Sequence, residues 1–261
     1  MSRYAIIIGV NHYTPVSQKG LKPLTGAIQD ATDIYKWAIA EGGVDPENAF
    51  LITSTEQPLN PIKHQVDQAV EKITAKIVEQ ESSKAERIYF YFAGHGIGVE
   101  LDRENNGLCM ANWTEYGSNT SSLSSKDYLL SFLNQGLFKE IVIWMDCCRT
   151  SRFFFTPAGP PSIQRLGNVS DPLYMVAFGS QFQNQAFEYS VGTNYQVDKR
   201  GVFTAVLLEG LNGGAETAGV INARTLGDYL HYFVPIRASE NNFLQHPEVI
   251  GNVSALNTIV F

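Results

Sequence analysis

Short apolar runs and longer amphipathic segments alternate along the first part of the chain. Residues 4–10 form a continuous apolar run, which predicts a strand buried on both faces. Apolar residues recur at helical spacing over 27–39 and stop at the glycine pair 42–43, as expected of a helix that ends at glycine. Residues 49–53 predict a second strand. Asn60-Pro61 has the pattern of an N-cap with proline at the first helical position, ahead of another apolar stripe.

The same alternation continues through the rest of the chain. Apolar runs at 88–93 and 141–145 predict two further strands. Between them we expect a polar loop over Glu100 to Gly107, a hairpin through 108–113, and a helix capped by Ser124 or Ser125. The remaining predicted elements are a strand at 173–178, helices at 201–211 and 223–234, and a final strand at 257–261. Strands that alternate with amphipathic helices indicate an α/β domain with a mostly parallel sheet and helices on both faces.

Composition places the chain among ordinary globular proteins. Of its 261 residues, 44% are hydrophobic and 17% are charged, which suits one large α/β domain or two small ones. The formal net charge is -7 and no basic cluster stands out, which argues against a nucleic-acid partner. No run approaches the roughly 18 apolar residues of a membrane helix, and the start of the chain reads as a buried strand rather than a signal peptide. Three cysteines, two of them adjacent, do not make a disulfide framework, so we expect a cytoplasmic protein.

Two of the predicted strands lead into residues that can carry out nucleophilic chemistry. One is followed by His95 between two glycines, and the other by Cys147 and Cys148. A parallel sheet gathers the residues that follow its strands at one edge, so we expect the histidine and a cysteine to meet there. An imidazole can take the proton of a thiol and later give it to a leaving amine. The sequence therefore indicates a thiol-dependent acyl-transfer site.

The residues around this pair fit stabilisation of an oxyanion. Gly96 has no side chain in front of its N–H, and the N–H of the nucleophilic cysteine can be the second donor. Strand alternation sends the side chains of Cys147 and Cys148 to opposite faces, which leaves either of them available as the nucleophile. A core histidine beside inert buried cysteines is the alternative interpretation. Cys109, in the expected hairpin, is interpreted as a packing residue.

Several segments, in order along the chain, resemble the caspase-like cysteine peptidases, which include caspases, metacaspases and bacterial relatives. The motifs Phe92-Ala-Gly-His-Gly96 and Met145-Asp-Cys-Cys-Arg149 look like the catalytic dyad of this family. The separation of 148 − 95 = 53 residues is close to the histidine-to-cysteine spacing of caspases. The segments 24–31, 177–188, 201–204 and 219–226 look like other parts of the family pattern, the last of them like its bacterial members.

The resemblance covers nearly the whole chain and implies a caspase-like fold with a central sheet of about six strands. We therefore expect a single peptidase domain over residues 1–261, with no prodomain before it. Within it, residues 1–148 resemble a large subunit, 149–171 an intersubunit loop and 172–261 a small subunit.

The resemblance also implies roles for individual residues. The metacaspase pattern of aspartate, any residue and cysteine makes Cys148 the nucleophile, with His95 as the base and the N–H groups of Gly96 and Cys148 as the oxyanion hole. Metacaspases bind arginine or lysine in an acidic pocket, whose aspartates map to Asp30 and Asp146. Two carboxylates can hold a guanidinium through bidentate bonds, so we expect arginine to be preferred. The sequence departs from the pattern at Ala93, where metacaspases often carry a serine.

Other functions stay open at this point. Caspases proper cleave after aspartate through an arginine-lined pocket, but no family arginine maps onto this sequence. A catalytically silent scaffold module and a thiol amidase acting on a small molecule are two further alternatives. In those cases Asp30 would be a helix-start residue and Asp146 a turn residue.

No cofactor is expected. The stretch Glu100 to Gly107 has oxygen ligands but lacks EF-hand spacing, so calcium activation, known in some metacaspases, is not indicated here. The expected partner is a protein substrate with a basic residue at the cleavage site. Bacterial relatives imply a role in cell death or antiphage defence, with a gasdermin-like protein as one possible substrate. Regulation would come from loop ordering or from a separate partner. The 149–171 loop, which contains Arg149, Arg152 and Arg165, is a candidate self-cleavage or activation segment.

Overall fold

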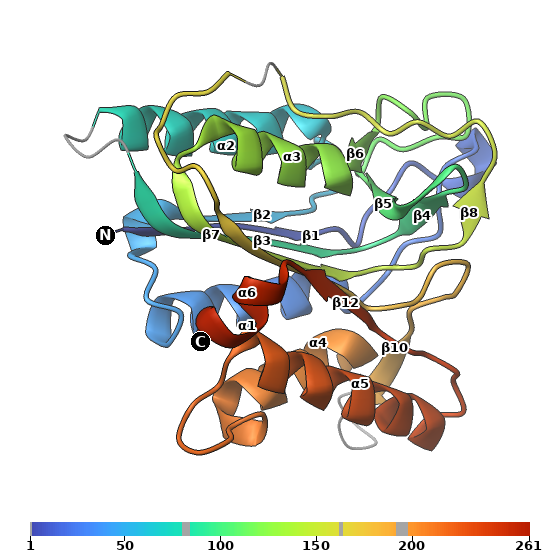
Figure 1. Cartoon of the computed structure of the whole chain (residues 1–261). Coiled ribbons are helices and arrows are strands. Elements are labelled where there is room, and N and C mark those ends of the chain that lie inside the picture. The colour runs from blue at the N-terminus through green and yellow to red at the C-terminus, as the bar shows by residue number, and fades with distance from the viewer. Residues whose placement is uncertain (1, 80–83, 162–163, 192–197) are drawn as a thin grey trace.

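A computed structural model describes residues 2–79, 84–161, 164–191 and 198–261, and a six-stranded sheet forms its centre (Figure 1). The strands are β1 (Arg3–Gly9), β2 (Ala49–Thr53), β3 (Ala85–Ala93), β7 (Phe138–Asp146), β9 (Leu173–Phe178) and β12 (Glu248–Gly251). Their spatial order is β12-β9-β7-β3-β1-β2, and all are parallel except β12, which pairs antiparallel with β9 at one edge. The prediction of a mostly parallel sheet of about six strands is confirmed.

Helices cover both faces of the sheet because its strands are apolar on both faces. One face carries α2 (Lys63–Val78) and α3 (Ser125–Gln135). The other carries α1 (Ala27–Ala40), α4 (Val202–Glu209), α5 (Ala223–Glu240) and α6 (Val253–Thr258) (Figure 1). In β1, Tyr4, Ile6 and Ile8 pack into the core under α2 and α3, whereas Ala5 and Ile7 pack toward α1.

Two smaller sheets and three short helical turns complete the described structure. The four-stranded sheet consists of β4 (Gly96–Val99), β5 (Asp102–Cys109), β6 (Ser122–Ser124) and β8 (Ser151–Arg152), and a separate hairpin consists of β10 (Glu188–Val191) and β11 (Asp198–Gly201). The helical turns are η1 (Val16–Gln18), η2 (Pro46–Asn48) and η3 (Gly210–Gly214). Because the β10–β11 hairpin is not hydrogen-bonded into the central sheet, its position depends on contacts with neighbouring loops and helices.

Four sequence predictions of local structure are wrong. The stretch Glu100 to Gly107 is not a solvated loop, because most of it belongs to β5, and the hairpin is β4–β5 rather than 108–113. Polar side chains are accommodated inside this strand since they find partners there: the Asn105 side chain accepts hydrogen bonds from Ser124 and from the N–H of Lys126. Alternation of apolar residues alone could not reveal a strand whose buried side is partly polar.

The other two errors concern a helix start and the end of the chain. Asn60-Pro61 precedes α2 but does not cap it, because the N-cap is Ile62, whose N–H donates to the Gln65 side chain at 2.8 Å. Residues 257–261 do not form a strand: α6 extends to Thr258, and beyond it Val260 makes a single bridge with Asn222. By contrast, the expected cap of α3 is present, since the Ser124 hydroxyl accepts a hydrogen bond from the N–H of Asp127.

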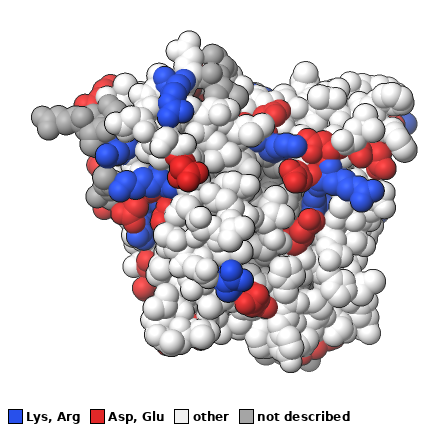
Figure 2. All heavy atoms as spheres, in the orientation of Figure 1, with Lys and Arg blue, Asp and Glu red and all other residues white. Residues whose placement is uncertain are grey.

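The surface of the described part of the chain carries mixed charge. Figure 2 shows acidic and basic side chains lying close together in clusters of both signs on the face that it displays. Among the described residues, no helix combines the length and the apolar character that crossing a membrane requires.

The strand register brings the chemically important residues to one edge of the sheet. Gly9 lies opposite Ala93 in the β1–β3 pair, and Ala93 lies opposite Asp146 in the β3–β7 pair. The three strands therefore end at the same level, and the residues that follow them meet at the carboxyl edge.

Candidate active site

The four side chains that the sequence singles out line one cavity at the carboxyl edge of the sheet. The cavity has a volume of about 250 Å³. His95 and Cys148 lie on its wall together with Asp30 and Asp146. The other residues of the lining are Leu24, Ala27, Ala93, Gly94, Cys147, Ala186, Phe187, Glu188, Lys199 and Gly201. The fold therefore assembles a thiol, an imidazole and two carboxylates from distant parts of the chain.

His95 is fixed from two sides. Its N–H donates to the Tyr13 hydroxyl at 2.8 Å, and the two rings pack with centroids 5.0 Å apart. Its Nε2 lies 2.8 Å from the carbonyl oxygen of Lys22. A carbonyl can only accept, so Nε2 carries the proton and Nδ1 is left as the acceptor. Burial lowers the pKa of His95, against the opposing effects of the Lys22 carbonyl and the Glu188 charge. The resting imidazole is therefore a neutral base.

Cys148 presents its sulfur to the cavity. Its Sγ accepts from the N–H of Ala186 at 3.3 Å and lies 3.5 Å from the Ala186 carbonyl oxygen. Burial raises the pKa of the thiol, although the N–H of Ala186 counteracts this effect. No hydrogen bond links the sulfur to His95 within the residues that the structure describes. Such contacts often tighten only when substrate binds.

Cys147 faces away from Cys148, as the alternation of side chains along a strand predicts. It is 2% exposed, and burial raises the pKa of its thiol well above the usual range. Cys109 is fully buried, and its pKa is raised to about 12 by burial. A thiol is reactive only as an accessible thiolate, so Cys148 is the better candidate for the nucleophile.

Asn106 on β5 supports the cysteine pair and was not recognised from the sequence. Its Nδ2 lies 3.1 Å from the Cys147 sulfur and 3.3 Å from the carbonyl oxygen of Cys148. The side chain is fully buried, and its own N–H is held by Ser125 at 2.9 Å. The amide thus anchors the peptide that carries the nucleophile. An asparagine inside a stretch that reads as a polar loop gives no sequence signal for this contact.

Replacing Asn106 with alanine is expected to lower kcat about tenfold while KM changes little. The Cys148 carbonyl would lose its donor inside the protein, which also lowers the free energy of unfolding by about 1–3 kcal/mol. Steady-state kinetics and urea denaturation measure the two effects. Ser131→Ala, which removes a buried hydroxyl from α3 away from the cavity, is the control. Unchanged kcat in N106A would contradict the anchoring role.

Gly96 begins β4 directly after His95. The carbonyl of His95 accepts from the N–H of Cys109, so Gly96 and its partner Leu108 form a non-hydrogen-bonded pair. The N–H of Gly96 therefore points away from β5. A Cβ at this position would lie 2.5 Å from the Cys148 carbonyl oxygen, which only glycine avoids. Gly96 therefore lies close to the nucleophile, and its N–H is not used in the hydrogen bonds between β4 and β5.

Asp146 is the last residue of β7 and reaches the start of α4. Its Oδ2 accepts from the N–H and the hydroxyl of Thr204 at 3.0 and 2.7 Å. Burial raises the pKa of Asp146 to about 6, although the bonds from Thr204 oppose this shift. Its Oδ1 accepts no hydrogen bond from the residues that the structure describes, so it is free to bind a ligand.

Asp30, on the first turn of α1, lies across the cavity from the end of β7. Its Oδ1 accepts from Arg200 Nε at 2.7 Å, and its Oδ2 accepts from the N–H of Gly201 at 2.7 Å. Burial and the neighbouring Asp146 raise its pKa to about 8, against the opposing bonds from Gly201 and Arg200. A Cβ on Gly201 would lie 2.0 Å from Asp146 Oδ2 and 3.0 Å from Asp30 Oδ2. The absence of a side chain at Gly201 therefore leaves room for both carboxylates.

Glu188 contributes a third carboxylate at the cavity. It accepts from the N–H of Gly26 at 2.8 Å and from the N–H of Thr25 at 3.4 Å, just before α1. Its charge raises the pKa of both His95 and Asp146, though in neither case as the largest cause. Sequence reasoning noted Glu188 only as part of a family-like segment, because its distance to His95 depends on the placement of the β10–β11 hairpin.

The fold and the cavity define the class as a caspase-like peptidase, and comparisons with known proteins agree. The family model described as the caspase domain, a peptidase family, matches residues 2–247. The chain therefore belongs to the caspase-domain family of peptidases. A probable protease from a Desulfuromonadales bacterium is 25% identical over an alignment of 229 residues, and the match covers 82% of this chain and 26% of that protein. The chain thus spans about a quarter of the length of that curated relative.

Solved structures show the same fold at low sequence identity. Caspase-1 from Spodoptera frugiperda superimposes with a TM-score of 0.59 at 14% identity, covering 99% of this chain and 88% of the caspase. Its pro form gives 0.56 at 16% identity, covering 100% and 94%. A protein from Geobacter sulfurreducens gives 0.59 at 15% identity, covering 98% and 97%. These similarities establish the caspase-like fold and confirm the resemblance seen in the sequence.

Proposed function

We propose that the protein is a cysteine endopeptidase that cleaves proteins after a basic residue, with arginine preferred over lysine. The observation that carries this proposal is one cavity that holds the Cys148 thiol and the His95 imidazole together with the buried carboxylates of Asp30 and Asp146. The thiol and imidazole supply the chemistry, and the carboxylates supply the charge that selects a cation.

The reaction proceeds in two acyl-transfer steps. His95 Nδ1 takes the thiol proton of Cys148, and the thiolate attacks the scissile carbonyl. The oxyanion accepts hydrogen bonds from the N–H groups of Gly96 and Cys148. The imidazolium then gives its proton to the leaving amine, and water, activated by the same imidazole, hydrolyses the thioester. No cofactor takes part in these steps.

The specificity pocket favours a guanidinium over other side chains. Asp146 Oδ1 is unoccupied, Asp30 adds a second negative charge, and Glu188 adds a third at the rim. A planar, permanently charged guanidinium can bond one carboxylate and lie between two, which the point charge of lysine does less well. A substrate aspartate would meet these carboxylates with a like charge, which disfavours the alternative of aspartate specificity.

The decisive experiment is a panel of fluorogenic peptides that differ only at the residue before the cleaved bond. We expect arginine to give the highest kcat/KM, lysine a lower value, and aspartate or citrulline little turnover. An arginyl chloromethyl ketone should label Cys148 and block hydrolysis. Faster cleavage after aspartate would reverse the specificity. No turnover and no labelling would favour a silent scaffold, and turnover of small amides alone would favour an amidase.

Self-cleavage within the 149–171 loop is expected to occur after Arg165 rather than after Arg149. Arg149 is 1% exposed, lies over the Phe178 ring at 3.8 Å, and is bonded to Glu248. Arg165 is exposed and makes a hydrogen bond only to the Val169 carbonyl among the described residues. Mass spectrometry of purified protein locates the cut.

Two variants test this choice of cleavage site. Arg165→Ala should leave the chain intact, whereas Arg152→Ala, which changes the other exposed arginine of the loop, should not. An active wild-type preparation that remains uncut would show that the loop is not an activation site.

We further propose a cytoplasmic role for the peptidase in bacterial cell death or antiphage defence. The bacterial origin of the curated relative supports a bacterial setting. Its substrate would be a protein with a basic cleavage site, such as a gasdermin-like protein, and a separate regulatory partner would control it. Recovery of cleaved proteins by their new amino termini after induction of wild type and C148A in cells would test this role.

A further inference from the structure

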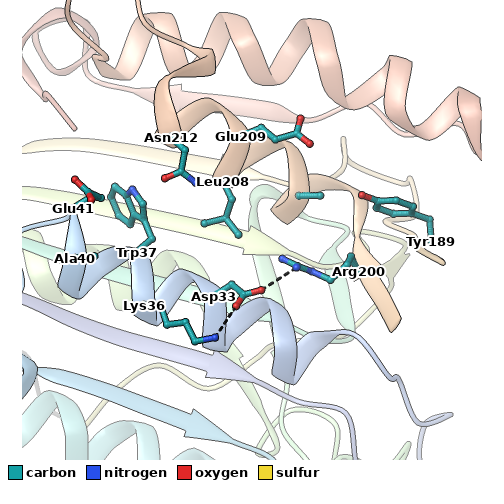
Figure 3. Close-up of a pocket in the computed structure, with 11 residues that line it drawn as sticks. Asp33, Lys36, Trp37, Ala40, Glu41, Tyr189, Arg200, Leu208, Glu209 and Asn212 are labelled. Atoms are coloured by element: carbon teal, nitrogen blue, oxygen red, sulfur yellow. Dashed lines mark hydrogen bonds and ion pairs between the residues drawn. The ribbon is translucent and has the colours of Figure 1, made fainter. Parts of the chain in front are cut away.

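Arg200 lies on the wall between the specificity pocket and a second, larger cavity. Its guanidinium donates from Nε to Asp30 at 2.7 Å and pairs through Nη1 with Asp33 at 2.9 Å. Asp30 lines the specificity pocket, whereas Asp33 lines a cavity of about 760 Å³ (Figure 3). Figure 3 shows Arg200 reaching Asp33 from the β11 side, with Lys36 on the far side of the same carboxylate. One arginine therefore joins the pocket carboxylate to a second acid on the same helix.

This arrangement leaves Asp30 with both oxygens engaged before substrate arrives. Arg200 holds Oδ1 and the N–H of Gly201 holds Oδ2. The hydrogen bonds of a substrate guanidinium would therefore go to Asp146, while Asp30 acts through its charge. That charge exists only while Asp30 is ionised.

Burial and the facing carboxylate of Asp146 disfavour the ionised form of Asp30, whereas the N–H of Gly201 and Arg200 favour it. Glu188 adds a further negative charge near Asp146. Asp30 is 1% exposed, so water does little to stabilise its charge. Among the described residues, Arg200 is the cation that hydrogen-bonds Asp30 and lowers its pKa, which is why this side chain matters to the pocket.

We propose that Arg200 is a positioning residue that determines specificity: it favours ionisation of Asp30 and fixes its carboxylate, so that the pocket can present two negative charges to the basic side chain of the substrate. The inference rests on the proposed cleavage after basic residues and assigns a part in it to a residue of the β10–β11 hairpin. Arg200 has the same charge as the substrate side chain, yet it strengthens binding through Asp30 rather than repelling the substrate.

The test compares two peptides that are identical except for arginine or citrulline before the cleaved bond. Citrulline has nearly the shape of arginine without its charge. In Arg200→Gln, kcat/KM for the arginine peptide at about pH 8.5, above the pKa of about 8 of Asp30 in the wild type, should fall roughly 10- to 100-fold, and that for the citrulline peptide should stay unchanged. The pH at which the arginine-to-citrulline ratio reaches half its maximum should also rise, because Asp30 binds its proton more tightly without Arg200.

Two further variants control for charge and for folding. Lys36→Gln also removes one positive charge, but Lys36 contacts Asp33 and not Asp30. This variant should therefore behave as the wild type does. Arg200→Lys keeps the charge but cannot reach both aspartates, so it should give an intermediate loss. If R200Q does not fold, the arginine-to-citrulline ratio of kcat/KM in R200K tests the role of Arg200 instead.

The outcomes separate this inference from the proposed function. If the wild type does not distinguish the arginine peptide from the citrulline peptide, both the function and the role of Arg200 are wrong. If the wild type distinguishes them and R200Q keeps the full ratio, only the role of Arg200 is wrong. An equal loss for both peptides, or a gain for the arginine peptide, would also overturn it.

Discussion

Replacing Cys148 with alanine is expected to reduce peptide hydrolysis by roughly 10⁴-fold or more, to the background of the assay. Among the described residues that line the cavity, Cys148 has the accessible thiol that can form the acyl intermediate, and the oxyanion donors act only on an intermediate that has formed. Replacing Cys147 with alanine should cost less than about tenfold, because its sulfur is buried and contacts Asn106. Fluorogenic turnover and mass-spectrometric detection of labelled cysteine measure the two variants.

The contrast between adjacent cysteines makes this comparison specific. Both variants remove one sulfur from the same turn, so a general loss of stability would affect them alike, and urea denaturation of each provides the control. Activity that survives in C148A but disappears in C147A would identify Cys147 as the nucleophile. The roles given to Ala186 and Gly96 would then be wrong.

Replacing Asp146 with asparagine is expected to lower kcat/KM for arginine peptides by roughly 100- to 1,000-fold, as removal of one partner of a buried charge pair does. The asparagine carbonyl can still accept from Thr204, which turns its amide group toward the pocket in place of the free Oδ1. The guanidinium would then meet a donor instead of an acceptor. Citrulline peptides should lose much less, since they carry no charge to bind.

The pH dependence of the arginine-to-citrulline ratio follows from the same carboxylates. The pKa values of Asp146 and Asp30 are raised to about 6 and about 8, and only the ionised forms attract a cation. The ratio should therefore fall as pH falls from about 8 to about 6, and D146N should lose the lower of the two steps. His95 and Cys148 titrate equally with both peptides, so the ratio removes their contribution. A ratio that stays flat with pH in the wild type would contradict the acidic pocket.

The sequence predicted the proximity of His95 and Cys148 better than it predicted the side chains around them. His95 and Cys148 come shortly after the ends of β3 and β7, which lie level in the sheet, so their proximity follows from a rule about parallel strands. Asp30 was found through the family resemblance alone, because a helix-start aspartate is common and carries no signal by itself.

The contacts around the site that could not be predicted from the sequence join residues that are far apart along the chain. Arg200 and Asp30 are 170 positions apart, and their meeting depends on a hairpin outside the central sheet. Asn106 and Cys147 are 41 positions apart and meet where the Asn106 side chain reaches the residues that follow β7. Neither contact produces a periodic pattern in the sequence. In addition, the polar residues of β5 made this strand read as a loop. Local patterns define elements, whereas these side chains acquire their roles only from the way the elements are placed.

The specificity pocket is built from both sides of the 149–171 loop. Asp30 and Asp146 precede this loop, whereas Glu188, Arg200 and Gly201 follow it. A cut in the loop leaves β7 and β9 paired as neighbours in the sheet, so the two pieces hold each other through the strands on which the pocket depends. If the proposed cut occurs, we expect a two-chain protein whose activity depends on association of the pieces, so that activity falls on dilution below their dissociation constant.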